Sequence, residues 1–167
     1  MADNQITEQD AQDAFWKALK SSNTGLLGLD RAGEASQPMT AFQDEGSNSI
    51  WFFTRDDVEL AQQVGSAGAD ARFDYGSKDQ KVWASLKGRL SVAPRNQEII
   101  DRHWNPVVAA WYPEGKEDPH LALLRFDGAD GRIWVSDGGL LSFAFQIIKA
   151  NMTGDTPDSG GAVDVRL

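Results

Sequence analysis

Strand-length apolar segments, each closed by turn residues, recur along most of this chain. The clearest runs from Lys81 to Ala93, where apolar and polar residues alternate as in a strand with one buried face. Further strands are predicted at residues 24–29, 38–42, 50–54, 69–75, 121–126 and 132–135. Segments 38–42 and 50–54 are predicted to pair, and Asp127–Gly131 contains an Asp-Gly pair typical of a hairpin turn. Many short strands in one chain favour a small closed or nearly closed antiparallel barrel.

Helices are predicted between the hairpins rather than after every strand. Thr7 can cap a helix that ends near Ser21, and further helices are expected at 58–64, 95–104 and 140–152. This arrangement predicts a β-rich α+β fold rather than a parallel α/β sheet. The length suits one domain, predicted at residues 1–153, followed by a flexible C-terminal tail at 154–167 that is rich in Gly, Pro, Asp and Ser.

Composition excludes several classes of function. The formal net charge of −9 disfavours nucleic acid and anionic membrane surfaces, because both attract dense Lys and Arg. The first residues lack an apolar stretch, and no later run reaches membrane-spanning length, so the protein is predicted to be cytoplasmic. The chain has no cysteine, which excludes disulfides, thiolate nucleophiles and cysteine-ligated metals. Any redox chemistry must therefore come from a cofactor.

A predicted strand at 50–54 leads directly into the predicted helix at 58–64. The first turn of a helix presents unpaired backbone N–H groups, which suit a phosphate beside an apolar sheet. Asp56 and Asp57 precede this helix and are interpreted as its caps. The junction is thus a candidate site for a phosphorylated cofactor.

No metal site is predicted. His103 and His120 are far apart and lack ligand-like spacing with carboxylates. Asp127 and Asp130 lie in a predicted turn that lacks the spaced acids of a calcium-binding loop.

A set of short motifs, in order along the chain, resembles one known family. The motifs are Met39-Thr40-Ala41, Ile50-Trp51-Phe52-Phe53-Thr54, Trp104-Asn105-Pro106, Ala110-Trp111-Tyr112-Pro113-Glu114-Gly115, Asp118-Pro119 and Trp134. Together they resemble the general stress protein 26 group of the pyridoxamine 5′-phosphate oxidase-like flavoproteins. The resemblance implies an antiparallel split β-barrel with flanking helices that binds FMN, with FAD as an alternative. It also implies a homodimer with flavin sites at the subunit interface.

The resemblance assigns flavin-binding roles to particular residues. Met39, Thr40 and Ala41 match positions along the edge of the isoalloxazine ring, and Phe53 and Thr54 match positions near the flavin tail. A flavin is a large flat ring that needs apolar faces and a few fixed polar groups at its rim.

Two further strands and one loop contribute to the site that the resemblance implies. Trp83 and Ser85 match the strand that approaches the cofactor, and Trp111 and Trp134 match aromatic residues near the interface. Most tryptophans fill cores or interfaces, so these indoles also have a purely structural interpretation. Trp111 is the exception, because a loop dense in Pro and Gly gives it little reason to serve a core.

The cation that holds the FMN phosphate in many members of the wider family is missing. Where a Lys or Arg is expected in the first turn after Phe53-Thr54, the chain has Asp57, Val58, Glu59 and Leu60. The phosphate must therefore be held by Thr54, Arg55, backbone N–H groups and Lys78.

Several functions remain open from the sequence. The protein is predicted to be an FMN-binding general-stress-type protein, acting as a flavin-dependent oxidoreductase or as a non-catalytic flavin binder. A pyridoxamine 5′-phosphate oxidase reaction is disfavoured, because the C-terminal segment lacks the cluster of Arg and His that binds that substrate in the family. A cofactor-free interaction domain is the third alternative.

Overall fold

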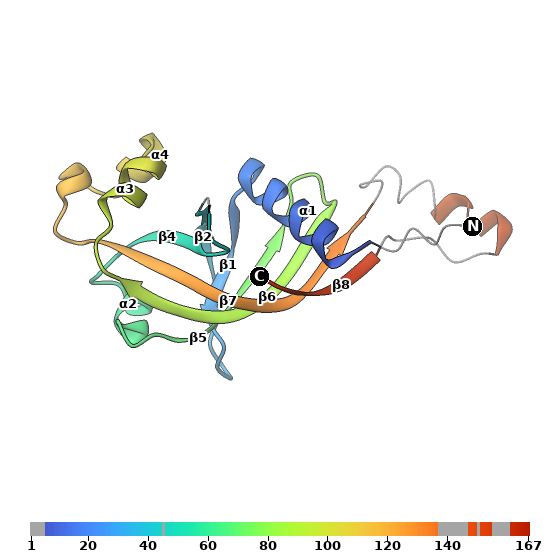
Figure 1. Cartoon of the computed structure of the whole chain (residues 1–167), viewed down its shortest axis with the longest axis horizontal. Helices are drawn as coiled ribbons and strands as arrows, with labels where there is room; N and C mark the ends of the chain where they lie inside the picture. The colour runs from blue at the N-terminus through green and yellow to red at the C-terminus, as the bar shows by residue number, and fades with distance from the viewer. Residues whose placement is uncertain (1–5, 45, 137–146, 150, 155–160) are drawn as a thin grey trace.

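The computed structural model describes residues 6–44, 46–136, 147–149, 151–154 and 161–167. Its strands form one antiparallel sheet in the spatial order β2-β1-β5-β6-β7-β4-β3, with β8 paired to β7 (Figure 1). The strands are β1 (Thr24–Leu29), β2 (Gln37–Thr40), β3 (Phe42–Gln43), β4 (Ile50–Arg55), β5 (Ala69–Gly76), β6 (Val82–Ala93), β7 (Leu121–Val135) and β8 (Gly161–Arg166). The helices are α1 (Glu8–Ser21), α2 (Glu59–Val64), α3 (Gln97–His103), α4 (Pro106–Ala109) and the 3-10 helix η1 (Gly115–Glu117).

The two edge strands of the sheet, β2 and β3, are consecutive in the chain and are joined at Ala41. Ala41 is buried, and its N–H donates a 2.7 Å hydrogen bond to the carbonyl of Asn23. The chain can pass from one edge to the other only if the sheet curls on itself. The predicted split barrel with flanking helices is confirmed as a strand-rich antiparallel half-barrel. The predicted pairing of 38–42 with 50–54 holds only at Phe42, opposite Trp51, because β2 pairs with β1 instead.

The predicted hairpin turn at 127–131 is wrong. β7 runs without interruption from Leu121 to Val135, and β6 pairs with both of its halves. Gly128 adopts a positive φ of 59°, and the register shifts opposite Lys87 and Arg89, so the extra residue forms a bulge. The Asp-Gly pair allows either a turn or a bulge, and the long partner strand β6 selects the bulge.

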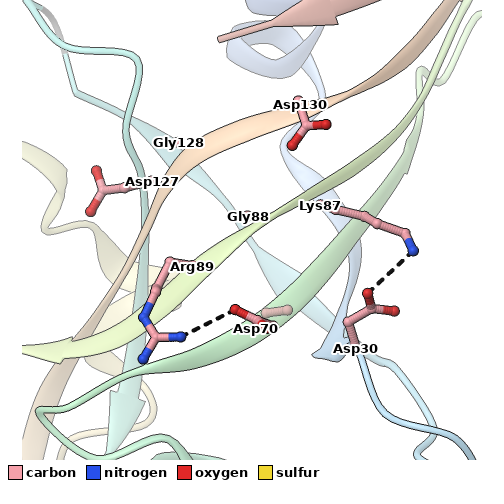
Figure 2. A pocket seen from close by; sticks show the side chains of 9 residues that line it. Asp30, Asp70, Lys87, Gly88, Arg89, Asp127, Gly128 and Asp130 are labelled. Atoms are coloured by element: carbon pink, nitrogen blue, oxygen red, sulfur yellow. Dashed lines mark hydrogen bonds and ion pairs between the residues drawn. The ribbon is translucent and has the colours of Figure 1, made fainter.

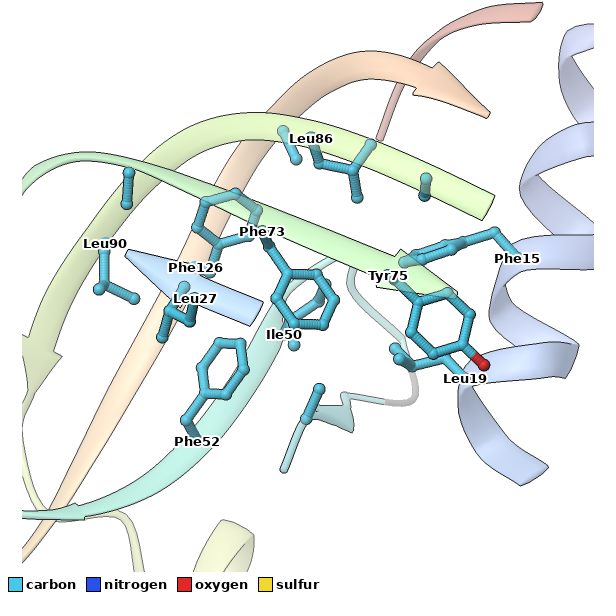
Figure 3. Packing of buried hydrophobic residues seen from close by; sticks show 14 of the residues in the cluster. Phe15, Leu19, Leu27, Ile50, Phe52, Phe73, Tyr75, Leu86, Leu90 and Phe126 are labelled. Carbon is cyan, nitrogen blue, oxygen red and sulfur yellow. The ribbon is translucent and has the colours of Figure 1, made fainter. Parts of the chain in front are cut away.

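The main core lies inside the half-barrel (Figure 3). Alternate residues of the strands point into it, and Phe52, Phe73 and Phe126 are fully buried there. Helix α1 closes one side, where Phe15 packs edge-on against Tyr75 at 5.6 Å between ring centroids. Thr7 caps α1 as predicted, through reciprocal hydrogen bonds with Asp10.

A second, smaller apolar cluster attaches α3 and α4 to the ends of β4 and β7. Its buried members are Trp51, Ile99, Ile100, Val108, Tyr112, Leu121 and Leu123. Strand β4 therefore has apolar neighbours on both faces, with Phe52 in the main core and Trp51 in the second cluster. This explains its nearly continuous apolar sequence.

The C-terminal residues, predicted as part of a flexible tail, contribute a strand. Strand β8 pairs with β7 from Asp130↔Arg166 to Val135↔Gly161, and Val165 is buried in the main core. Residues 155–160 and most of the helix predicted at 140–152 lie outside the described residues, although 147–149 and 151–153 are helical. Among the residues described, no helix is both long and apolar enough to cross a membrane.

Candidate functional site

Two predicted site tryptophans form a pair on the outer face of the sheet. Trp83 of β6 lies directly opposite Trp134 of β7, and they are 49% and 41% exposed. Gly76 of β5 is the partner of Trp83 on the other side, and a Cβ at Gly76 would lie 2.5 Å from the Trp83 ring. The absence of a side chain at Gly76 therefore makes room for the indole. The pair presents a flat aromatic surface to solvent.

Ser85 and Lys78 lie near this pair. Ser85 is half-buried, two residues after Trp83 on the same face of β6, and its hydroxyl donates a 2.7 Å hydrogen bond to Asp74. Lys78 is exposed in the turn between β5 and β6. The Trp83 ring N–H donates to the carbonyl of Gln80 in that turn, at 3.3 Å. The structure thus brings Lys78, Trp83, Ser85 and Trp134 to one region.

A second group lies at the end of β4. Phe53 packs edge-on against Phe42 and Trp104, with centroid distances of 5.5 and 6.3 Å. Thr54 is buried, whereas the side chain of Arg55 is 32% exposed. These residues offer an aromatic ring, a hydroxyl and a cation.

Met39, Thr40 and Ala41 occupy the closure of the half-barrel and precede both groups in the sequence. Met39 packs against the main core and Thr40 is exposed opposite Thr24. Ala41 is buried and its N–H is bonded to the carbonyl of Asn23, so its role toward a flavin stays a prediction.

The two groups lie at opposite ends of β7 in one chain. Phe53 pairs with Leu123, whereas Trp83 pairs with Trp134, eleven residues further along β7. At about 3.3 Å per residue this is a strand contour of roughly 36 Å. Strand β7 curves but extends along much of the molecule (Figure 1). This contour length exceeds the span of one isoalloxazine ring.

Trp111 belongs to the β4 end. It is 71% exposed, and with Pro106, Val107 and Ala110 it lines an open, mainly apolar depression of about 500 Å³. The next residue, Tyr112, is buried and donates a 2.7 Å hydrogen bond from its hydroxyl to the carbonyl of Thr54. The loop that carries Trp111 is therefore fixed to the end of β4.

The interpretation of Asp56 and Asp57 as helix caps is wrong. The N-cap of α2 is Val58, which makes no side-chain capping bond. Arg55 instead forms two hydrogen bonds to Asp57, at 3.0 and 2.8 Å, and the Nδ1 atom of His120 lies 2.8 Å from Asp56. Asp56 donates its backbone N–H to the carbonyl of His120 at 3.0 Å, which holds the two segments together.

We call Arg55, Asp56, Asp57 and His120 the junction cluster. The hydrogen bond between His120 and Asp56 raises the pKa of His120 above its ordinary value. The hydrogen bonds from Arg55 lower the pKa of Asp57. The ligand atoms of Asp56, Asp57 and His120 lie within 4.8 Å of one another, but all three residues are exposed and already form ion pairs. We therefore assign an ion-pair cluster. His120 was missed from sequence because it follows Asp57 by more than sixty residues.

A charged depression on the outer face of the sheet does not suit a flavin. It measures about 440 Å³ and lies where β6 and β7 bulge. Figure 2 shows Lys87 directed at Asp30 and Arg89 directed at Asp70, with ion pairs of 3.2 and 3.1 Å. Asp127 and Asp130 also line it, so four carboxylates face two cations. A phosphate or an apolar ring would be disfavoured there.

Comparisons with known proteins agree with this architecture. Residues 10–158 match the family model described as pyridoxamine 5′-phosphate oxidase like. A structure from Jannaschia sp. CCS1, described as a general stress protein 26, is 32% identical over 95% of this chain and 99% of its own, with a TM-score of 0.83. A general stress FMN/FAD binding protein from Xanthomonas citri is 40% identical over 79% of this chain and 93% of its own, with a TM-score of 0.68.

A protein from Xanthomonas campestris pv. campestris, described as a general stress family protein, is 40% identical over 80% of this chain and 92% of its own, with a TM-score of 0.68. No curated protein matches the chain. The family match spans well over half of the sequence, and the Jannaschia structure is covered almost completely. The chain therefore belongs to the pyridoxamine 5′-phosphate oxidase-like family, within its general stress protein 26 group.

Proposed function

We propose that this protein binds FMN between two copies of itself. The observation that carries the proposal is the separation of the predicted flavin residues into two groups at opposite ends of β7. One chain holds the two groups at opposite ends of β7, whereas a symmetric dimer can combine the β4 end of one copy with the Trp83–Trp134 face of its partner. The Xanthomonas citri relative, 40% identical, is described as an FMN/FAD binding protein.

The side chains present suit the parts of a flavin. The exposed indoles of Trp83 and Trp134 offer flat apolar surface for the ring. Thr54, Arg55 and Lys78 offer a hydroxyl and two cations for the phosphate, although Arg55 is already paired with Asp57. Oxidation and reduction are the chemistry that a flavin supplies when bound, and the chain would bind and orient it.

The proposal is tested by titrating the purified protein with FMN and FAD. Visible absorbance and quenching of flavin fluorescence report binding, and light scattering after gel filtration reports the mass. We expect saturable binding of FMN to a dimer, with FAD as the alternative ligand. A monomer that leaves flavin fluorescence unchanged would contradict the proposal and favour a cofactor-free interaction domain.

Two arginine variants test the phosphate assignment. Arg55→Gln removes a cation of the proposed site, and we expect it to weaken FMN binding on the order of tenfold. Arg89→Gln is the matched control, because Arg89 also pairs with one exposed carboxylate, Asp70, but lies in the charged depression. Equal FMN affinity in the two variants would count against the role of Arg55.

A separate measurement distinguishes an oxidoreductase from a flavin binder. Bound flavin is mixed anaerobically with NADH or NADPH, and bleaching of its absorbance followed by turnover on re-oxidation indicates an enzyme. A flavin that stays oxidised with both donors favours a binding or carrier role. The cytoplasmic location inferred from the sequence stays a prediction.

A further inference from the structure

The junction cluster combines one permanent and one conditional positive charge. Arg55 stays protonated at all physiological pH values, whereas an imidazole titrates near neutrality. Asp57 faces both cations, with its Oδ2 atom 2.8 Å from Arg55 Nη2 and 3.8 Å from His120 Nδ1. Asp56 faces His120 at 2.8 Å. The cluster is therefore neutral when His120 is protonated and carries one net negative charge when it is not.

A third carboxylate, that of Asp118, lies beside His120. Asp118, two residues earlier in the same loop, is buried and accepts a hydrogen bond from the His120 backbone N–H at 2.9 Å. Once His120 is neutral, Arg55 alone would face the carboxylates of Asp56, Asp57 and Asp118. With Asp118 counted, these groups carry one net negative charge when His120 is protonated and two when it is neutral, so a phosphate dianion approaching this junction meets stronger repulsion in the neutral state.

Resting on the FMN-binding function proposed above, we propose that His120 is a further cation of the phosphate end, beside Arg55, and that its protonation controls FMN affinity. The His120 side chain is 49% exposed, so it can exchange its Asp56 partner for a phosphate oxygen without burying a charge. It lies at the first turn after Phe53-Thr54, the place where the family's usual lysine or arginine is missing. The carboxylate of Asp56 raises the pKa of His120, which extends the protonated form toward neutral pH.

The experiment measures dissociation constants for FMN and riboflavin between pH 6.5 and 9 by quenching of flavin fluorescence. Above pH 6.5 the phosphate of FMN is mainly a dianion, since its second pKa is about 6, so the protein's own titration is observed. Riboflavin has the same ring and no phosphate. We expect FMN affinity to fall on the order of tenfold as pH rises, while riboflavin affinity stays constant.

Removing the charge of His120 and making it permanent should have opposite effects on FMN affinity. His120→Gln should bind FMN at every pH as weakly as the natural protein does at pH 9. His120→Arg keeps the charge and should bind FMN tightly across the range. Lys17→Gln, which removes an exposed cation from α1, is the control and should retain the pH dependence of the natural protein.

The outcomes separate this inference from the function on which it rests. A pH dependence that persists in His120→Gln, that riboflavin shares, or that is missing from the natural protein would overturn the role of His120 while FMN binding stands. A protein that binds neither FMN nor riboflavin at any pH would overturn the proposed function and this inference with it.

Discussion

The hydroxyl of Tyr112 donates a hydrogen bond of 2.7 Å to the carbonyl oxygen of Thr54, 58 residues earlier in the chain. Tyr112 is buried in the second apolar cluster, and burial raises its pKa to about 12. The bond closes the end of β4 against the loop that presents Trp111. The bond thus joins two segments that carry predicted flavin residues.

Replacing Tyr112 by Phe tests how much this bond stabilises the fold. Phe keeps the ring in the cluster but leaves the Thr54 carbonyl without its partner, so we expect the free energy of unfolding to fall by about 1–3 kcal/mol. Urea denaturation at pH 7 measures the change. Trp111→Phe is the control, because the exposed Trp111 ring should contribute less than about 0.5 kcal/mol. Equal stabilities in the two variants would contradict the assignment.

The raised pKa of Tyr112 also predicts an alkaline loss of stability. An unfolded tyrosine ionises near pH 10, whereas folded Tyr112 ionises near 12, so the stabilisation is complete below pH 10 and is lost as pH rises toward 12. Between pH 9 and 11.5 the unfolding free energy should fall by about 1–2 kcal/mol more in the natural protein than in Tyr112→Phe. Burial also raises the pKa of Tyr75, but both proteins contain Tyr75, so its effect on the unfolding free energy cancels in the comparison. Parallel pH profiles would refute this prediction.

Gly131 and Gly76 differ in what an added Cβ would meet: backbone at Gly131 and a side chain at Gly76. A Cβ at Gly131 would lie 2.0 Å from the carbonyl oxygen of Ser85, which the paired strand cannot move away. Gly131→Ala should therefore lower the unfolding free energy by about 1–3 kcal/mol or more. A Cβ at Gly76 would meet the exposed ring of Trp83, which can swing aside. Gly76→Ala should change tryptophan fluorescence and cost less than about 1 kcal/mol. A larger loss of stability in Gly76→Ala than in Gly131→Ala would contradict the prediction that the backbone contact costs more than the side-chain contact.

Local signals predicted the elements that local contacts determine. Helix α1 begins where Thr7 can cap it, and the alternation from Val82 onward gives β6 with one buried face. Gly128 shows the limit of such signals, since its positive φ suits a turn and a bulge equally and the long-range partner β6 decides. The same reasoning applies to the site. The sequence contains His120 and Asp56, but only the folded chain shows that they lie 2.8 Å apart.

The outer face of the sheet presents an exposed pair of tryptophans. Trp83 and Trp134 are cross-strand neighbours and remain about half exposed, which is a large aromatic surface to leave in water. A second copy of the chain packed on this face would bury it. Because a two-fold interface repeats every substitution, one change per chain is applied twice.

Trp134→Lys should therefore convert the proposed dimer to a monomer, because two added charges would be buried in the interface without partners. The matched control is Ala32→Lys, which adds the same charge to an exposed turn after β1 and should leave the dimer intact. Light scattering after gel filtration gives the mass, and circular dichroism checks that both variants stay folded. We expect Trp134→Lys to lose FMN binding together with the dimer, because the two chains contribute different parts of the site. A folded Trp134→Lys monomer that still binds FMN with natural affinity would show that one chain suffices.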